Sequence, residues 1–297
     1  MTGNPLIVVF LPIALGIVMA GLGLHLGLAD FRRVWRMPRA MLVALAVQLL
    51  VLPPVAFLIA RASGLPGELA LGLVLLAASP GGVTANLFSH LARGDVALNI
   101  SLTAVNSVLA LLTLPLWVAV GLRVFLGDEA SVPPPTRKVI EVAVLVIVPV
   151  VLGMAVRHFK PAWADAAEKP VRVLSTLILA TIIVLAVASE WDLLTRYARV
   201  LGLACVGFNV VSLLAGFFAA RAARLGTPQA TAIAFEIGIH NSTLAIFIAL
   251  EVLSRPAAAI APALYSLSMY VTAALFAAWL LKRLRARGGD GIGHQNA

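Results

Sequence analysis

Apolar segments of about 20 residues recur from one end of the 297-residue chain to the other. Each segment is long enough to cross a hydrocarbon core of about 30 Å as a helix. Hydrophobic residues make up 61% of the chain and charged residues only 12%, roughly half the charged share of a soluble domain. A water-facing surface cannot be built from this composition. Because no ten-residue alternation of polar and apolar residues occurs, the segments predict spanning helices and not barrel strands.

The segments predict an all-α polytopic membrane protein with about nine transmembrane helices. In chain order they are 5–28, 38–60, 68–91, 96–122, 138–158, 170–189, 198–220, 228–252 and 258–281. The connections are short, so residues 1–297 are expected to form a single membrane domain. The longest loop is expected near Gly127 to Pro135, and 288–297 is expected to be a disordered tail. The first segment lacks a preceding cationic region and a clear cleavage site, so we expect it to be a retained span.

The basic residues predict the orientation of the chain and argue against a nucleic-acid partner. The formal net charge is +9, but Lys and Arg sit in short loops between apolar spans and form no continuous basic face. Cytoplasmic loops carry the excess of Lys and Arg. The poorer side holds only seven of the 22 such residues, namely Arg61, Arg123, Arg137, Lys138, Arg196, Arg199 and Arg255. We therefore expect the N-terminus outside and the C-terminus in the cytoplasm, in the inner (plasma) membrane of the cell.

The third and eighth segments are each interrupted by a polar patch. In the third, Pro80 removes a backbone donor, and Gly81 and Gly82 permit unusual dihedral angles, so the backbone can leave the helix. Freed backbone groups must face protein, water or a bound ion, because lipid cannot satisfy them. The plainer alternative is a kinked helix whose neighbours satisfy these groups. The eighth segment is interrupted by 236–242, Glu-Ile-Gly-Ile-His-Asn-Ser.

A weak internal echo relates the two interruptions. Gln48 and Asn209 each lie one segment earlier, and Leu65-Pro66 and Thr227-Pro228 precede the broken segments. The two broken segments run in opposite directions in the predicted topology. An inverted repeat with a discontinuous helix in each half is the sequence pattern that points to a transport site at mid-membrane.

Glu236 is an ionisable residue deep inside an apolar span, which is costly and usually functional. A protonated, merely hydrogen-bonded carboxyl is the structural alternative. Because no Lys or Arg lies at similar depth, a metal ion is the natural counter-charge, and hard monovalent cations take oxygen ligands. Such oxygens are available from Gln48, Asn86, Asn99, Thr103 and backbone carbonyls.

Two further polar features accompany Glu236. Asn99, Thr103 and Asn106 are spaced i, i+4, i+7 and therefore share one helix face; for Asn106 we favour interhelical bonding. His240 follows Glu236 by four residues, but the HExxH motif is absent. Imidazole titrates near neutral pH, so proton coupling stays open as an alternative. The lone Cys205 lies within a span, so a disulfide framework is excluded.

These residues resemble the signature of the bile acid:sodium symporter family. The resemblance rests on 79–86 (Ser-Pro-Gly-Gly-Val-Thr-Ala-Asn), 91–98 with Thr103, and 236–242 followed by Leu244-Ala245. Further matching residues are Met19, Gly21, Gly23, Leu24, Leu26, Asp30, Phe31, Pro149, Leu152 and Gly153.

The resemblance implies a nine-helix form with two crossing discontinuous helices, a core (38–122 and 198–281) and a panel (5–28 and 138–189). It implies sodium-coupled symport of an organic anion, bile-acid-like or a small carboxylate, by alternating access, with no cofactor beyond the coupling ion and no protein partner. By motif, one sodium site takes Asn86, Asn99, Thr103 and Glu236. The other takes Gln48, Glu236, His240 and the carbonyls of Ile237 and Ile239, while Asn241 faces the substrate.

The sequence departs from the family pattern at Ala85 and Asn99, where serine is common, and at His240, where glutamine is common. A nitrogen ligand suits sodium poorly. Proton-coupled transport or export of an organic or inorganic anion on the same fold is therefore the alternative. The related arsenite exporters use a cysteine at the broken helix, whereas Cys205 lies elsewhere. An enzyme is not expected, because no nucleophile–base pair or metal cluster is evident, and a receptor would need a soluble output domain.

Overall fold

The computed structural model describes residues 5–127 and 136–289, and every named element in these ranges is a helix. The expectation of an all-α fold is confirmed. The elements are α1 (Pro5–His25), α2 (Leu28–Arg36), α3 (Pro38–Ala46), η1 (Val47–Val51), α4 (Leu52–Ala62), α5 (Gly67–Ala78), α6 (Thr84–Leu91), α7 (Val96–Leu126), α8 (Thr136–Phe159), α9 (Pro161–Ser189), α10 (Trp191–Ala222), α11 (Thr227–Gly238), α12 (Ser242–Phe247), η3 (Ile248–Val252), η4 (Pro256–Ala259) and α13 (Ile260–Gly289).

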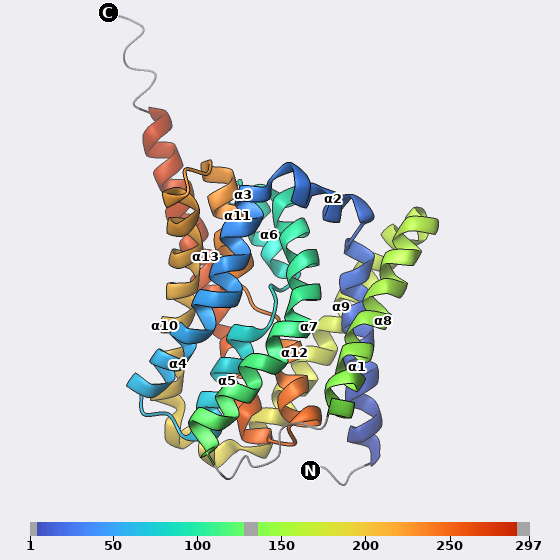
Figure 1. Cartoon of the computed structure of the whole chain (residues 1–297), viewed down its shortest axis with the longest axis vertical. Helices are drawn as coiled ribbons and strands as arrows, with labels where there is room; N and C mark the ends of the chain where they lie inside the picture. The colour runs from blue at the N-terminus through green and yellow to red at the C-terminus, as the bar shows by residue number, and fades with distance from the viewer. Residues whose placement is uncertain (1–4, 128–135, 290–297) are drawn as a thin grey trace, which may run out of the picture.

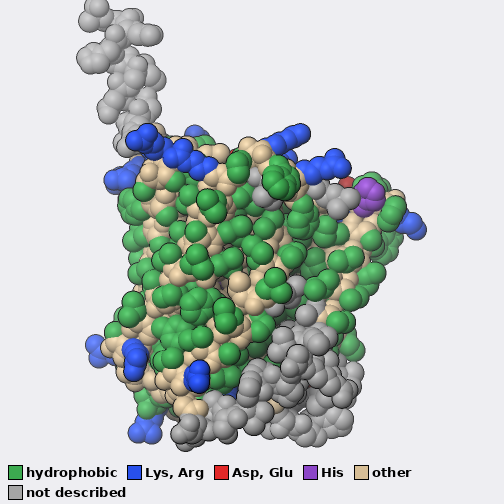
Figure 2. All heavy atoms as spheres, viewed as in Figure 1, with side chains coloured by type: hydrophobic (Ala, Val, Ile, Leu, Met, Phe, Trp, Pro, Cys, Tyr) green, Lys and Arg blue, Asp and Glu red, His purple; other side chains and the backbone are tan. Residues whose placement is uncertain are grey.

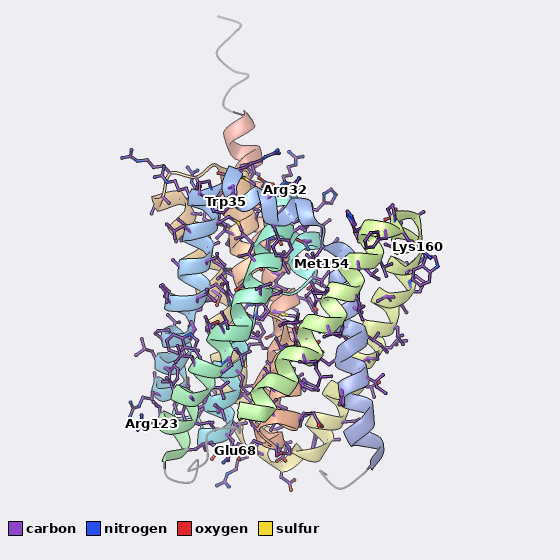
Figure 3. All side chains as sticks on the ribbon, turned by 45° about the vertical axis from the view of Figure 1, so that its right-hand side comes forward. Arg32, Trp35, Glu68, Arg123, Met154 and Lys160 are labelled. Atoms are coloured by element: carbon purple, nitrogen blue, oxygen red, sulfur yellow. The ribbon has the colours of Figure 1, made fainter. Side chains whose placement is uncertain are left out.

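The long helices run side by side in one bundle (Figure 1). The start of α1 and the end of α13 lie at opposite ends of this bundle. Lys and Arg gather at these two ends, and a broad hydrophobic belt lies between them on the face shown (Figure 2). Arg32 and Lys160 lie at the end where α13 finishes, whereas Arg123 and Glu68 lie at the other (Figure 3). This distribution is that of a protein embedded in a bilayer by its apolar belt.

Three helical stretches in the described residues are long and apolar enough to cross a membrane: Pro38–Ala62, Trp191–Ala222 and Pro256–Leu284. A fourth is obtained if Val96–Ala110 and Leu112–Leu126, bent by 57°, count as one span. Shorter apolar helices, among them Gly67–Ala78 and Ser242–Val252, belong to the interrupted segments. The fold class is therefore polytopic and all-α, and the count of nine spans stays a prediction.

Several helices extend beyond their predicted edges. α9 begins at Pro161 and α10 at Trp191, because each helix continues into a charged, water-facing turn that a hydropathy pattern does not include. α2 was not predicted as an element, since its sequence, Leu-Ala-Asp-Phe-Arg-Arg-Val-Trp-Arg, is amphipathic and too short to span. At the C-terminus, α13 continues to Gly289 and so includes 288–289 of the predicted tail. The rest of the tail and most of the predicted 127–135 loop lie outside the described residues.

Helix α1 packs closely on α8 through two glycines. A Cβ atom on Gly23 would lie 2.2 Å from the carbonyl oxygen of Val150, and one on Gly153 would lie 2.4 Å from that of Ala20. Backbone approach of this kind is the usual way in which membrane helices associate. α9 also packs on α1 and α8, while α5 packs on α7, and α10 on α11 and α13. The division into panel and core stays a prediction with which these contacts agree.

A π-helical turn, η1, interrupts the second span and ends two residues before Pro53 and Pro54. Pro53 has no N–H with which to bond the carbonyl of Leu49, four residues earlier. The indole N–H of Trp117 on α7 donates to that carbonyl at 3.1 Å instead. The turn widens the helix where Gln48 faces the protein interior, and π-helical turns are frequent at functional sites.

Candidate functional site

The two interrupted segments meet at mid-height of the bundle, with α6 and α11 in one half and α5 and α12 in the other (Figure 1). Gly81 and His240 form an isolated antiparallel bridge. The N–H of Gly82 donates to the carbonyl of Ile239 at 2.6 Å, and the N–H of Asn241 donates to that of Pro80 at 2.8 Å. The breaks therefore satisfy part of each other's freed backbone, which lipid could not do.

Glu236 lies on α11 one turn before the second break, and it is only 2% exposed. The hydroxyl of Thr103 on α7 donates to its Oε2 at 2.6 Å. The Asn106 amide and the Gly81 backbone also lie close to the carboxyl group. A Cβ atom on Gly81 would lie 2.2 Å from Oε1, so a side chain at this position would displace the carboxyl group. In the described residues Glu236 has no basic ion-pair partner.

The polar face predicted on α7 is present, and it points at α11. Asn99 is fully buried, and its Nδ2 donates to the carbonyl of Ala232, one turn before Glu236, at 2.7 Å. Its Oδ1 has no hydrogen-bond partner among the residues that the structure describes. The side chain of Asn86 on α6 also carries a buried Oδ1 without a partner. No hydrogen bond joins Asn86 to Glu236.

Gln48 approaches the first break from the π-helical turn. Its Nε2 donates to the carbonyls of Ala77 at 3.3 Å and Ser79 at 3.0 Å, which are freed where α5 ends. Its Oε1 is buried and has no hydrogen-bond partner. The Nε2 atom of Gln48 thus binds the end of α5, while its Oε1 atom is available to accept a bond from a ligand.

His240 is buried at the second break, and its Nδ1 lies 3.4 Å from the carbonyl of Ser79. Gln48 and His240 therefore share a neighbour across the two breaks. The imidazole stacks on Phe208, with the ring centroids 5.5 Å apart and the planes 18° apart. Within the described ranges, its Nε2 has no hydrogen-bond partner.

The remaining predicted residues flank the same break. The carbonyl of Ile239 already accepts the bond from Gly82, and Ile237, at the end of α11, is fully buried. The half-buried Asn241 caps α12, because its Oδ1 accepts the N–H of Leu244 at 3.1 Å. Its amide NH₂ is the part of the side chain that can donate to a ligand.

Sequence reasoning missed Tyr265 and Thr272 on α13, which join Asn209 beside the second break. The available signal was the spacing of Tyr265, Ser268 and Thr272 at i, i+3, i+7, which places three polar groups on one helix face.

Asn106, for which interhelical bonding was favoured, lies near the carboxyl of Glu236.

The chemistry of the site is that of oxygen donors in a buried setting. The described residues hold no group of three His, Cys, Asp or Glu side chains that could bind a metal ion. What they hold instead is one carboxyl group, several amide oxygens and a hydroxyl, a donor set suited to a hard cation.

The fold and this site define a polytopic α-helical membrane protein whose two interrupted helices pair in its interior. Residues 12–197 match the model of the Sodium Bile acid symporter family, and the chain belongs to this family. The match includes the first break and the polar face of α7.

Curated relatives agree with this assignment. An uncharacterized sodium-dependent transporter of Bacillus subtilis, YocS, is 27% identical over 94% of this chain and 85% of its own length. The P3 protein of Homo sapiens is 30% identical over 82% of this chain, and the probable chloroplastic sodium/metabolite cotransporter BASS1 of Arabidopsis thaliana is 26% identical over 84%. The chain spans 50% of the P3 protein and 61% of BASS1. This is a family of sodium-dependent transporters and not of enzymes.

Proposed function

We propose that this protein is a secondary active transporter that couples the entry of sodium to the uptake of an organic anion by alternating access. The relatives supply the class, since they carry the names of sodium-dependent transporters and cotransporters. The observation that carries the proposal for this chain is a set of buried oxygens without hydrogen-bond partners. In the described part of the chain, those that belong to predicted ligands are Gln48 Oε1, Asn86 Oδ1, Asn99 Oδ1 and Glu236 Oε1; the side-chain oxygens of Ser89, Asn106 and Ser242 are also buried without partners.

Buried acceptors without partners are costly, and native proteins leave few of them. A bound cation would satisfy these oxygens and balance the charge of the carboxylate, whereas bound water would satisfy them without balancing that charge. We assign a first sodium site to Asn86, Asn99, Thr103 and Glu236. The support is that Thr103 bonds Glu236 directly and Asn99 bonds the preceding turn of the same helix.

A second cation site is proposed at the crossing itself, with Gln48, Glu236, His240 and the carbonyls of Ile237 and Ile239. Gln48 and His240 both contact the carbonyl of Ser79, which supports a shared environment. The two sites share Glu236, so that binding at one affects the other through the same carboxylate.

The organic anion, bile-acid-like or a small carboxylate, is proposed to bind beside the crossing, where the amide NH₂ of Asn241 can donate to it. In this scheme the core helices move against the panel formed by α1, α8 and α9. The protein acts in the inner (plasma) membrane with its N-terminus outside and its C-terminus in the cytoplasm. The only ligands required are sodium and the anion.

One observation favours an alternative mode of coupling on the same fold. Nε2 of His240 is buried without a partner at the place where sodium would prefer an oxygen. In the alternative, which is proton-coupled transport or export of an organic or inorganic anion, the imidazole of His240 would carry a proton and would not bind sodium.

The test is uptake into proteoliposomes of purified protein, with a panel of bile acids and small carboxylates as probes. An inward sodium gradient is compared with choline at equal ionic strength, and each is combined with an inward proton gradient. Sodium-driven accumulation of an anion supports the proposal. Accumulation driven by protons alone, without a sodium effect, contradicts it and supports the alternative.

A further inference from the structure

The carbonyl of Gly238, the last residue of α11, is held by side chains from two other helices. The hydroxyl of Tyr265 on α13 donates to it at 2.7 Å, and Nδ2 of Asn209 on α10 donates to it at 2.6 Å. In a continuous helix this carbonyl would accept the N–H of Ser242, which instead donates to His240. The bond that the break removes is thus replaced by two others.

The two side chains that donate to this carbonyl, Asn209 and Tyr265, also take part in further hydrogen bonds. Nδ2 of Asn209 also donates to the oxygen of Tyr265, at 2.6 Å. The hydroxyl of Thr272 donates to Oδ1 of Asn209, and it also lies 3.1 Å from the carbonyl oxygen of Ser268 and 3.0 Å from that of Met269 on its own helix. Asn209 and Tyr265 are both fully buried. A satisfied polar network of this kind in a low-dielectric interior specifies one arrangement of the backbone, because any shift leaves a buried group unpaired.

The position of Gly238 gives this network its importance. Gly238 lies two residues after Glu236 and two residues before His240. The ring of Tyr265 also contacts His240, with centroids 5.6 Å apart. The direction in which the backbone leaves α11 therefore depends on groups that touch neither the Glu236 carboxyl nor the first break.

The first break shows the contrast. Gln48 precedes its break by one span, as Asn209 does, and likewise donates from its amide to the carbonyls that end the first half-helix. Its oxygen, however, has no partner, whereas the oxygen of Asn209 is occupied by Thr272. The oxygen of Gln48 is therefore available to a ligand, whereas the oxygen of Asn209 already accepts a hydrogen bond from Thr272.

We propose that Asn209, Tyr265 and Thr272 form a positioning clamp that fixes the backbone of the second break and thereby sets the affinity of the Glu236 site for sodium. This proposal rests on the proposed function, because it assigns the clamp to that cation site. The three residues are positioning residues and contact neither the ion nor the anion.

The experiment measures the sodium concentration that gives half-maximal thermal stabilisation of the purified protein, with choline chloride keeping the ionic strength constant. Thr272→Val and Tyr265→Phe each remove one hydroxyl with little change in shape. Each should raise the half-maximal sodium concentration by about 5- to 10-fold, the effect of one net hydrogen bond. Thr272→Ser keeps the hydroxyl and should restore the wild-type value.

Matched controls are available on α7 and α13. Thr113→Val removes a hydroxyl that bonds only the carbonyl of Leu109 on its own helix, and Tyr270→Phe alters a ring stacked on Phe88. Both should keep the wild-type sodium response. Hydrogen exchange of the 236–244 segment in the absence of sodium should accelerate in Thr272→Val and Tyr265→Phe and remain unchanged in the controls.

The outcomes separate the clamp from the proposed function. If wild-type protein shows no sodium-dependent stabilisation, the proposed function fails. If wild type responds to sodium and the clamp variants respond identically, the clamp proposal is overturned. A lower unfolding temperature with an unchanged sodium response, or loss of folding in both variants, also overturns it, because the residues would then act on stability alone.

Discussion

The hydroxyl of Thr103 on α7 donates a 2.6 Å hydrogen bond to Oε2 of Glu236 on α11, across 133 residues of sequence. The bond connects α7, the second helix after the first break, with α11, the helix that precedes the second break. It also fixes one carboxyl oxygen, so that Oε1 is the one presented towards Gly81.

Replacement of Thr103 by valine should weaken sodium binding. A hydrogen bond to a charged group contributes roughly 1.5–3 kcal/mol, which corresponds to roughly a 10- to 100-fold loss of apparent sodium affinity. Titration of thermal stabilisation with sodium measures this change. Thr103→Ser should retain most of the affinity, and Thr113→Val serves as a control on the same helix. An unchanged titration in Thr103→Val would exclude Thr103 from the site.

Gly81→Ala should disable the site, because the new methyl group would lie 2.2 Å from Oε1 and 2.4 Å from Cδ of Glu236. We expect loss of sodium-dependent stabilisation and a folding cost of about 1–3 kcal/mol from overpacking. Gly207→Ala is the matched control, since a Cβ at this position meets nothing within 4 Å. Wild-type sodium binding by Gly81→Ala would show that the carboxyl group does not sit above the first break.

Much of this arrangement could be predicted from the sequence. Segment length and hydropathy predicted the helices, because lipid requires a spanning segment to be apolar and to satisfy its own backbone hydrogen bonds. Pro80 with Gly81 and Gly82 predicted the first break, and the polar face of 99–106 predicted the approach of α7 to Glu236, because these signals are local. The family resemblance is confirmed, and the two ligand sets that it implies stay predictions.

The rest depends on contacts between distant segments. The pairing of Gly81 with His240 follows from how two breaks pack, which no local pattern contains. Thr272 carries a weak signal, because Ser and Thr in membrane helices often bond their own backbone, as Thr272 also does at the carbonyls of Ser268 and Met269. Helix α2 was missed, since its basic residues exclude it from a search for apolar segments.

The contact between α1 and α8 predicts a change in stability without a change in sodium affinity. Gly153→Ala would place Cβ 2.4 Å from the carbonyl oxygen of Ala20. This should destabilise the fold by about 1–3 kcal/mol, because two backbones must separate. Thermal unfolding with and without sodium measures both quantities, with Gly207→Ala again as control. A shift of the sodium half-point in the folded Gly153→Ala protein would contradict the separation of this contact from the site.

His240→Gln tests the departure at the second break. An amide oxygen in place of the imidazole would offer sodium a hard ligand. We expect stronger sodium dependence of uptake and at least a several-fold lower half-maximal sodium concentration. His158→Gln is the control, as this histidine is exposed at the end of α8. No change in His240→Gln would mean that the imidazole does not limit a second cation site.

Glu236 is the residue on which both proposed cation sites depend, and Glu236→Gln removes its charge while keeping its size. The most direct measurement is the rise in unfolding temperature when sodium replaces choline, in wild type and in Glu236→Gln. Our account predicts a saturable rise in wild type and none in the variant, although the variant remains folded. An equal, saturable rise in both proteins would contradict the assignment of Glu236 as the shared sodium ligand.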